Sequence, residues 1–295
     1  MPSQRDTTAT ETRPPANSTT LKRDRVIVTV AALIWIAGTA LGSGWFGGGG
    51  VSEQGGGLFS DDATLIAPMG PAFSIWLVIY VGLIGYVVWQ WLPGSAESNW
   101  ARRTRLPAAA AIALNGIWLA VVHAGWVGIS VLVMLGLVVA LGLVLRRTAT
   151  LEPERWPAQV WIAATFGLYL GWICVATAAN IASWLVGLGV AAASPLATGL
   201  TIAVLIAVLA LTAFLLSRTR QPVFRAALSA AVAWGTAWAA AGRLAGDLLN
   251  RPVGITAGII ALVVIVLGAL FVARQPRSLP EKASTGRRAR FRRAR

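Results

Sequence analysis

The feature that most constrains this chain is a series of eight apolar stretches, each close to the length of a helix that crosses a bilayer. About 20 apolar residues in a helix span roughly 30 Å of hydrocarbon. The stretches are residues 26–46, 70–92, 107–122, 127–145, 157–186, 196–217, 223–242 and 253–273. Only 12% of the residues are charged, whereas soluble domains carry about 25%. We therefore predict an all-α, polytopic membrane bundle of about eight transmembrane helices.

The basic residues fall in alternate connections between these stretches. Of 25 Lys and Arg residues, 23 lie in the N-terminal tail, in the C-terminal tail, or near the connections that follow the second, fourth and sixth stretches. The other two are Arg243 and Arg251. Because cytoplasmic loops retain Lys and Arg, we expect a multi-pass protein of the cell membrane with both termini in the cytoplasm. The net charge of +14 then reflects topology, and we expect no nucleic-acid partner.

Ionisable side chains are nearly absent from the apolar stretches, which argues against catalysis inside the membrane. The two lysines, Lys22 and Lys282, lie outside all eight stretches, so a membrane Schiff base is excluded. The chain has one histidine, His123, and one cysteine, Cys174. No acid, base and nucleophile can be grouped from these residues. We expect no enzyme activity, no metal site and no covalent cofactor.

Aromatic and amide residues repeat at helical spacing on three of the predicted helices. Such stripes place side chains on one helix face, and a buried amide needs a partner, water or a ligand. They point to a cavity for a flat, apolar ligand, although helix packing is an alternative explanation. The candidate ligand-binding residues are Trp76 and Tyr80 on the second helix, Asn115 and Trp118 on the third, and Trp172, Ala176 and Asn180 on the fifth.

The first outer connection, residues 47–69, is long, rich in glycine and free of Lys and Arg. It contains GGGG and GGG tracts together with Glu53, Asp61 and Asp62. Glycine-rich segments of this kind serve as flexible linkers, whereas long ordered loops often cover binding sites. Both interpretations, a linker and a lid over the cavity, remain open at the level of sequence.

Residues 169–184 read YLGWICVATAANIASW, which resembles the fifth-helix signature of the translocator protein or tryptophan-rich sensory protein (TspO/MBR) family. The segment FSIWLVIY and the pair Asn115 and Trp118 are similar to its second-helix and third-helix patterns. A departure is Leu168, where the family usually has proline. The resemblance covers residues 26–186 as a five-helix bundle and leaves residues 187–273, three additional transmembrane helices, outside it.

The resemblance implies a pocket for porphyrins, haem, related tetrapyrroles or sterols within the five-helix bundle, beneath the first outer loop. It implies the same seven residues as pocket positions. We expect residues 1–25 to form a disordered cytoplasmic tail and residues 274–295 a basic cytoplasmic tail. The predicted function is a receptor or sensor that binds a planar hydrophobic ligand, and transport of a small hydrophobic solute is the alternative. The spacing of Gly167 and Gly171 suits either a homodimer or packing within the bundle.

Overall fold

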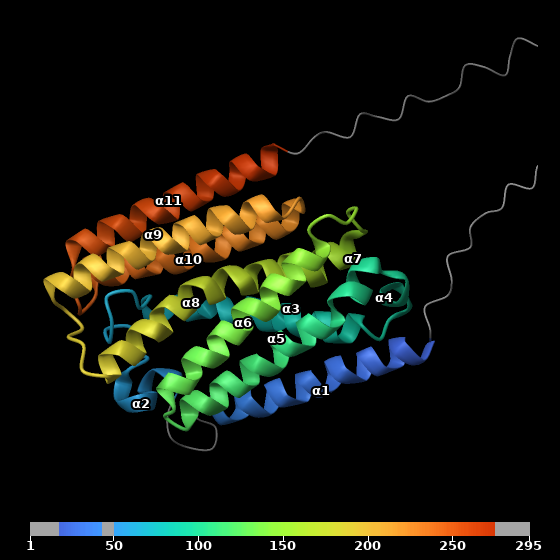
Figure 1. Cartoon of the computed structure of the whole chain (residues 1–295), viewed down its shortest axis with the longest axis horizontal. Coiled ribbons are helices and arrows are strands. Elements are labelled where there is room, and N and C mark those ends of the chain that lie inside the picture. Colours follow the sequence, from blue (N-terminus) through green and yellow to red (C-terminus); the bar gives the residue numbers. More distant parts are fainter. Residues whose placement is uncertain (1–17, 43–49, 275–295) are drawn as a thin grey trace, which may run out of the picture.

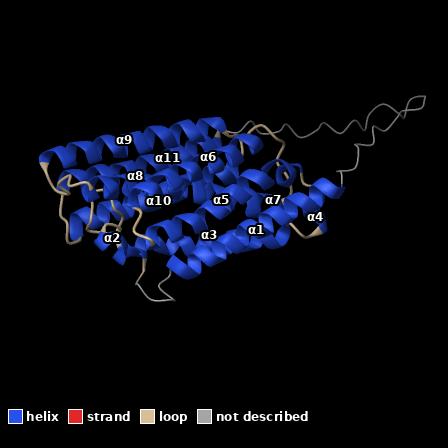
Figure 2. Ribbon diagram, turned by 60° about the horizontal axis from the view of Figure 1, so that its bottom comes forward, coloured by secondary structure: helices blue, strands red, loops and turns tan. Residues whose placement is uncertain are grey.

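The computed structural model describes residues 18–42 and 50–274, and this part of the chain is helical without strands (Figures 1 and 2). The long helices are α1 (Ser18–Gly42), α3 (Ile75–Trp89), α5 (Asn99–His123), α6 (Val127–Thr148), α8 (Thr165–Gly187), α9 (Pro195–Arg218), α10 (Pro222–Ala245) and α11 (Arg251–Ala273). The short elements are η1 (Val51–Glu53), α2 (Gln54–Gly57), η2 (Gly70–Ser74), α4 (Pro93–Glu97), α7 (Trp156–Ala158) and η3 (Gln159–Ala164).

Seven helical segments in the described residues are long and apolar enough to cross a membrane, and they correspond to seven of the eight predicted spans. Large apolar side chains on these helices, such as Leu33, Leu77 and Leu262, are at least 60% exposed. Exposed apolar faces of this extent are matched by lipid rather than by water. The fold is therefore a polytopic helical membrane bundle, as predicted.

The eighth predicted span, α10, is a helix of 24 residues that is not among these seven segments. It lies between α8 and α11, and most of its small side chains are buried. Arg225 near its start donates hydrogen bonds to the carbonyls of Leu216 and Phe271, near the ends of α9 and α11. A cation is stabilised near the C-terminal carbonyls of helices. The low apolarity of α10 is thus explained by its position inside the protein.

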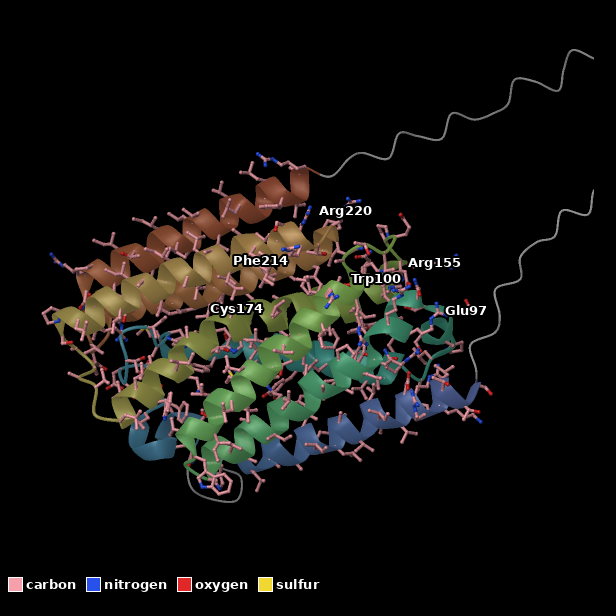
Figure 3. The ribbon with its side chains drawn as sticks, in the orientation of Figure 1. Glu97, Trp100, Arg155, Cys174, Phe214 and Arg220 are labelled. Carbon is pink, nitrogen blue, oxygen red and sulfur yellow. The ribbon has the colours of Figure 1, made fainter. Side chains whose placement is uncertain are left out.

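The long helices run roughly along one axis, so the molecule has two distinct ends (Figure 1). The first residue of α1 and the last residue of α11 lie at the same end. Glu97, Trp100, Arg155 and Arg220 lie toward this end (Figure 3), which we name the basic end. The segment 50–74 lies at the opposite end, which we name the loop end.

The helices pack as a series of neighbours in which α5 contacts α1 and α6, α6 contacts α8, and α8 contacts α10. The helix pair α1 and α5 approaches most closely at two glycines. A Cβ built on Gly38 would lie 2.1 Å from the carbonyl oxygen of Gly116. Any side chain at Gly38 would therefore separate the two helices, which form one wall of the site described below.

Two boundaries differ from the sequence prediction. Helix α1 begins at Ser18, so residues 18–25 of the predicted disordered tail are helical. Arg25 donates hydrogen bonds to the Leu92 carbonyl and the Ser95 hydroxyl, and these contacts hold the helical residues that precede the predicted span.

The fifth span also contains a π-helical segment, η3, before α8. Residues 1–17, 43–49 and 275–295, including nearly all of the predicted basic tail, lie outside the described residues.

Candidate functional site

The three predicted stripes converge at the loop end of the bundle. Trp76 on α3 is the centre of an aromatic cluster that joins α3 to α8. Its ring centroid lies 5.3 Å from that of Tyr80, 5.8 Å from that of Tyr169 and 6.2 Å from that of Trp172. Phe73 contacts Trp172 edge to face at 5.6 Å. Edge-to-face and tilted pairs of this kind fix ring orientation and add about 0.5–1.5 kcal/mol each beyond area burial.

The two buried asparagines connect the helices that carry the stripes. The Trp118 indole N–H donates to Asn180 Oδ1 at 3.0 Å, and Asn180 Nδ2 donates to the Ser130 hydroxyl at 2.9 Å. The Tyr80 hydroxyl donates to Asn115 Oδ1 at 3.3 Å. A buried amide without partners would be costly, so these bonds hold α3, α5, α6 and α8 in register. Ser130 was not predicted from the sequence, because a single serine in an apolar helix has no distinctive pattern.

Two adjoining cavities lie between these side chains and the outer segment 50–70. The outer cavity has a volume of about 540 Å³ and is bordered by α1, α3, α5 and this segment. The inner cavity, of about 50 Å³, extends from it toward α6 and α8. Both cavities are lined by Val51, Phe59, Ser60, Phe73, Trp76 and Trp118. Pockets for small ligands typically measure about 300–1,000 Å³, so the outer cavity alone has the required size.

All seven predicted residues border these cavities, but they divide between the two. Tyr80 lines the outer cavity, and Trp76 and Trp118 form the shared wall. The remaining four, namely Asn115, Trp172, Ala176 and Asn180, line the inner cavity. The stripe on α8 therefore forms the floor of the site, while the larger volume lies nearer to α1 and the outer loop.

The described part of the outer connection packs against the helices. Thr64, Leu65, Ile66 and Ala67 are buried, and Phe59 contacts the Trp118 ring edge to face at 6.1 Å. The tract Gly55–Gly57 has φ values of 61°, 71° and 85°, a region that side-chain-bearing residues rarely adopt. These glycines permit the sharp turn before Phe59. The segment forms a wall of both cavities, which favours the lid interpretation over the linker.

A residue that the sequence did not single out for the site holds this segment in place. Arg243, near the end of α10, is 1% exposed and donates to the Thr64 carbonyl at 2.9 Å and to the Asp61 carbonyl at 2.6 Å. Helix α10 also contacts η2, which follows this segment, because the Trp234 indole N–H donates to the Ala72 carbonyl at 2.8 Å. Helix α10 therefore holds the segment that borders the two cavities. The acceptors are backbone carbonyls, so no side-chain pattern identifies them in the sequence.

Gly167 and Gly171 are used for packing within the chain. A Cβ on Gly171 would lie 2.4 Å from the Leu228 carbonyl oxygen, and one on Gly167 would lie 2.9 Å from the Phe224 carbonyl oxygen. Both glycines thus allow α10 to approach the backbone of α8. This observation supports packing within the bundle at these positions, and it leaves this face of α8 covered.

The fold and the site define a polytopic helical membrane protein with an aromatic cavity bordered by the folded segment 50–70. In the described residues, no group of three or more His, Cys, Asp or Glu side chains could hold a metal ion. A family model described as TSPO-like protein matches residues 25–271, and the chain belongs to this family. The match includes α9–α11, which the sequence resemblance had left out. Comparisons with curated proteins and with solved structures gave no significant match.

Proposed function

We propose that the protein binds a planar, largely apolar ligand in the outer cavity and acts as a membrane receptor or sensor without catalysing a reaction. Porphyrin, haem and sterol-like molecules are the candidate ligands. The observation that carries the proposal is a cavity of about 540 Å³ bordered by Phe59, Phe73, Trp76, Tyr80 and Trp118. Aromatic rings offer flat apolar surfaces on which a planar ligand can stack. Membership of the TSPO-like family supports a ligand-binding role.

The arrangement of polar groups supports binding rather than chemistry. The amides of Asn115 and Asn180 are engaged with neighbouring side chains, and the site contains hydroxyls and indoles in place of an acid–base pair. The Trp172 N–H is buried and has no hydrogen-bond partner in the described part of the chain. Since Trp172 lines the inner cavity, it can donate to an oxygen of a ligand that extends inward.

The test compares two tryptophans of α3 by substitution with leucine. Trp76→Leu removes the ring shared by both cavities. Loss of stacking worth about 0.5–1.5 kcal/mol or more should weaken porphyrin binding by a factor of about two to more than ten. Trp89→Leu is the control, because Trp89 is a buried tryptophan of the same helix but lies at the basic end, outside both cavities. Affinity is measured by quenching of tryptophan fluorescence, with folding checked by circular dichroism.

Equal porphyrin affinities for wild type and Trp76→Leu would contradict the pocket assignment. For the alternative function, transport, the same variants in liposomes should alter uptake of the bound molecule. Binding without any ligand flux across the bilayer would favour the receptor function over transport.

We further propose that the loop end faces away from the cytoplasm, which makes the outer cavity accessible from outside the cell.

A further inference from the structure

Formal charge is distributed unevenly around the outer cavity. Asp61 is the one acidic or basic residue among its lining side chains, and the phenol of Tyr80 is the other titratable group. It is half-buried, and one of its carboxylate oxygens accepts a hydrogen bond from the Gly70 backbone N–H at 2.8 Å. Gly70 also lines the cavity, so this bond fixes the carboxylate at the cavity wall. The wall of the outer cavity therefore presents one carboxylate to a ligand.

No Lys, Arg or His of the described residues lines the cavity. Residues 26–101 contain neither Lys nor Arg, and this range includes the segment 43–49 that is outside the described residues. Arg243 interacts electrostatically with Asp61 and Asp62 and offsets part of their charge, but its guanidinium donates to the carbonyls of Thr64 and Asp61 and is absent from the lining of both cavities. His123 and Arg251 do not line them either.

The wider surroundings have the same sign. Residues at the loop end include four carboxylates, from Glu53, Asp61, Asp62 and Asp247, against the two guanidinium groups of Arg243 and Arg251. A site with low-dielectric walls strengthens the effect of such an excess on a charged ligand that enters from this end. An anionic group would therefore lose hydration and meet a negative potential.

The remaining polar groups of the site suit an uncharged ligand. Thr39 and Tyr80 line the outer cavity, and each contributes a hydroxyl group to it. A hydroxyl can both donate and accept, and the Trp172 N–H adds a neutral donor beside the inner cavity. The Trp172 N–H, which has no hydrogen-bond partner in the described part of the chain, gains most from a ligand that supplies a hydroxyl or carbonyl oxygen.

We infer that the outer cavity selects planar apolar ligands that are uncharged, or that present a hydrogen-bond donor or a positive charge to Asp61, and disfavours tetrapyrroles with free carboxylates. This inference rests on the proposed function, because it defines the chemistry of the ligand for the same cavity. The inference predicts that the cavity binds the porphyrin macrocycle and that the ionised carboxylate substituents of the macrocycle weaken this binding.

The experiment uses two probes with the same macrocycle, protoporphyrin IX and its dimethyl ester, titrated against the full-length protein in an uncharged detergent. The variants are Asp61→Asn and Asp62→Asn. Asparagine at position 61 keeps an oxygen that can accept from the Gly70 N–H but removes the charge. Asp62 is exposed and does not line either cavity, so its variant makes the same change in net charge away from the site.

We expect the dimethyl ester to bind wild type about fivefold or more tightly than the diacid, because a like charge within a partly buried site opposes binding. Asp61→Asn should reduce this ratio by at least about threefold, whereas Asp62→Asn should leave it unchanged. Comparing ratios between variants in one detergent cancels the different partitioning of the two probes into micelles.

Equal ratios for wild type and Asp61→Asn, or tighter binding of the diacid by wild type, would overturn the inference while leaving the proposed function intact. Failure of both probes to bind any folded form would instead overturn the proposed function itself. Equal reductions by Asp61→Asn and Asp62→Asn would show that a general surface potential is responsible, and would remove the assignment of selectivity to Asp61.

Discussion

Replacing Arg243 by methionine should loosen the outer segment without dismantling the bundle. Methionine keeps much of the apolar volume of the side chain and removes both hydrogen bonds to the segment. Hydrogen bonds to charged groups contribute about 1.5–3 kcal/mol each. Removing the buried cation also removes its desolvation cost, so the loss in global stability is smaller than the sum of the two bonds.

Local opening of the segment is the sensitive quantity. The Ala67 backbone N–H donates to the Thr64 carbonyl at 3.3 Å and to the Thr64 hydroxyl at 3.2 Å, directly beside the contact made by Arg243. We expect Arg243→Met to lower the free energy of local opening by the equivalent of one hydrogen bond, about 1.5–3 kcal/mol. Amide exchange at Ala67 should then accelerate about 10- to 150-fold. Ala67 also lines the inner cavity, so porphyrin should dissociate faster.

The assay is hydrogen–deuterium exchange of the peptide that contains residues 64–67, together with stopped-flow dissociation of porphyrin. Arg251→Met is the matched control, because Arg251 is the other arginine at the loop end and is exposed. Unchanged exchange at Ala67 in Arg243→Met would show that burial of the segment, rather than its two bonds to α10, keeps it in place.

Two further predictions concern packing and topology. Gly171→Ala should destabilise the protein by about 1–3 kcal/mol in a titration with SDS, since the added methyl group meets the α10 backbone. The control is Gly142→Ala, which should be neutral or slightly stabilising because a Cβ there meets nothing within 4 Å. Identical unfolding midpoints for the two variants would contradict close packing of α8 against α10. A reporter fused after Arg295 should read cytoplasmic and one inserted near Asp61 should read outside, whereas the reverse pattern would mean that the orientation is inverted.

The helical spacing of aromatic residues was sufficient to predict that side chains from three helices gather around one region of the bundle. Trp76, Trp118 and Trp172 lie on three different helices, yet the period of the helix and the alternating direction of the spans place all three around adjoining cavities. The span lengths likewise anticipated the long helices, because hydrocarbon thickness imposes a length that appears directly in the sequence.

What the sequence did not reveal depends on contacts between distant segments. The role of Arg243 requires carbonyls 179 and 182 residues earlier in the chain, and its charge alone indicated a loop residue. The division of the site into a large outer and a small inner cavity depends on how Phe59 meets Trp118, which no local pattern encodes. The resemblance also stopped at residue 186, although the family match extends to residue 271, because the recognised motifs lie on the first five helices.

The glycine face of α8, formed by Gly167 and Gly171, determines whether a helix contact varies with the amount of protein in the membrane. Between separate molecules, occupation of such a face would vary with their density in the bilayer. Here the occupant, α10, is joined to α8 through α9, and the connection between Gly187 and Pro195 is short. Covalent attachment gives the contact a fixed effective concentration. The contact that brings Arg243 to the segment 50–70 is therefore maintained at any expression level.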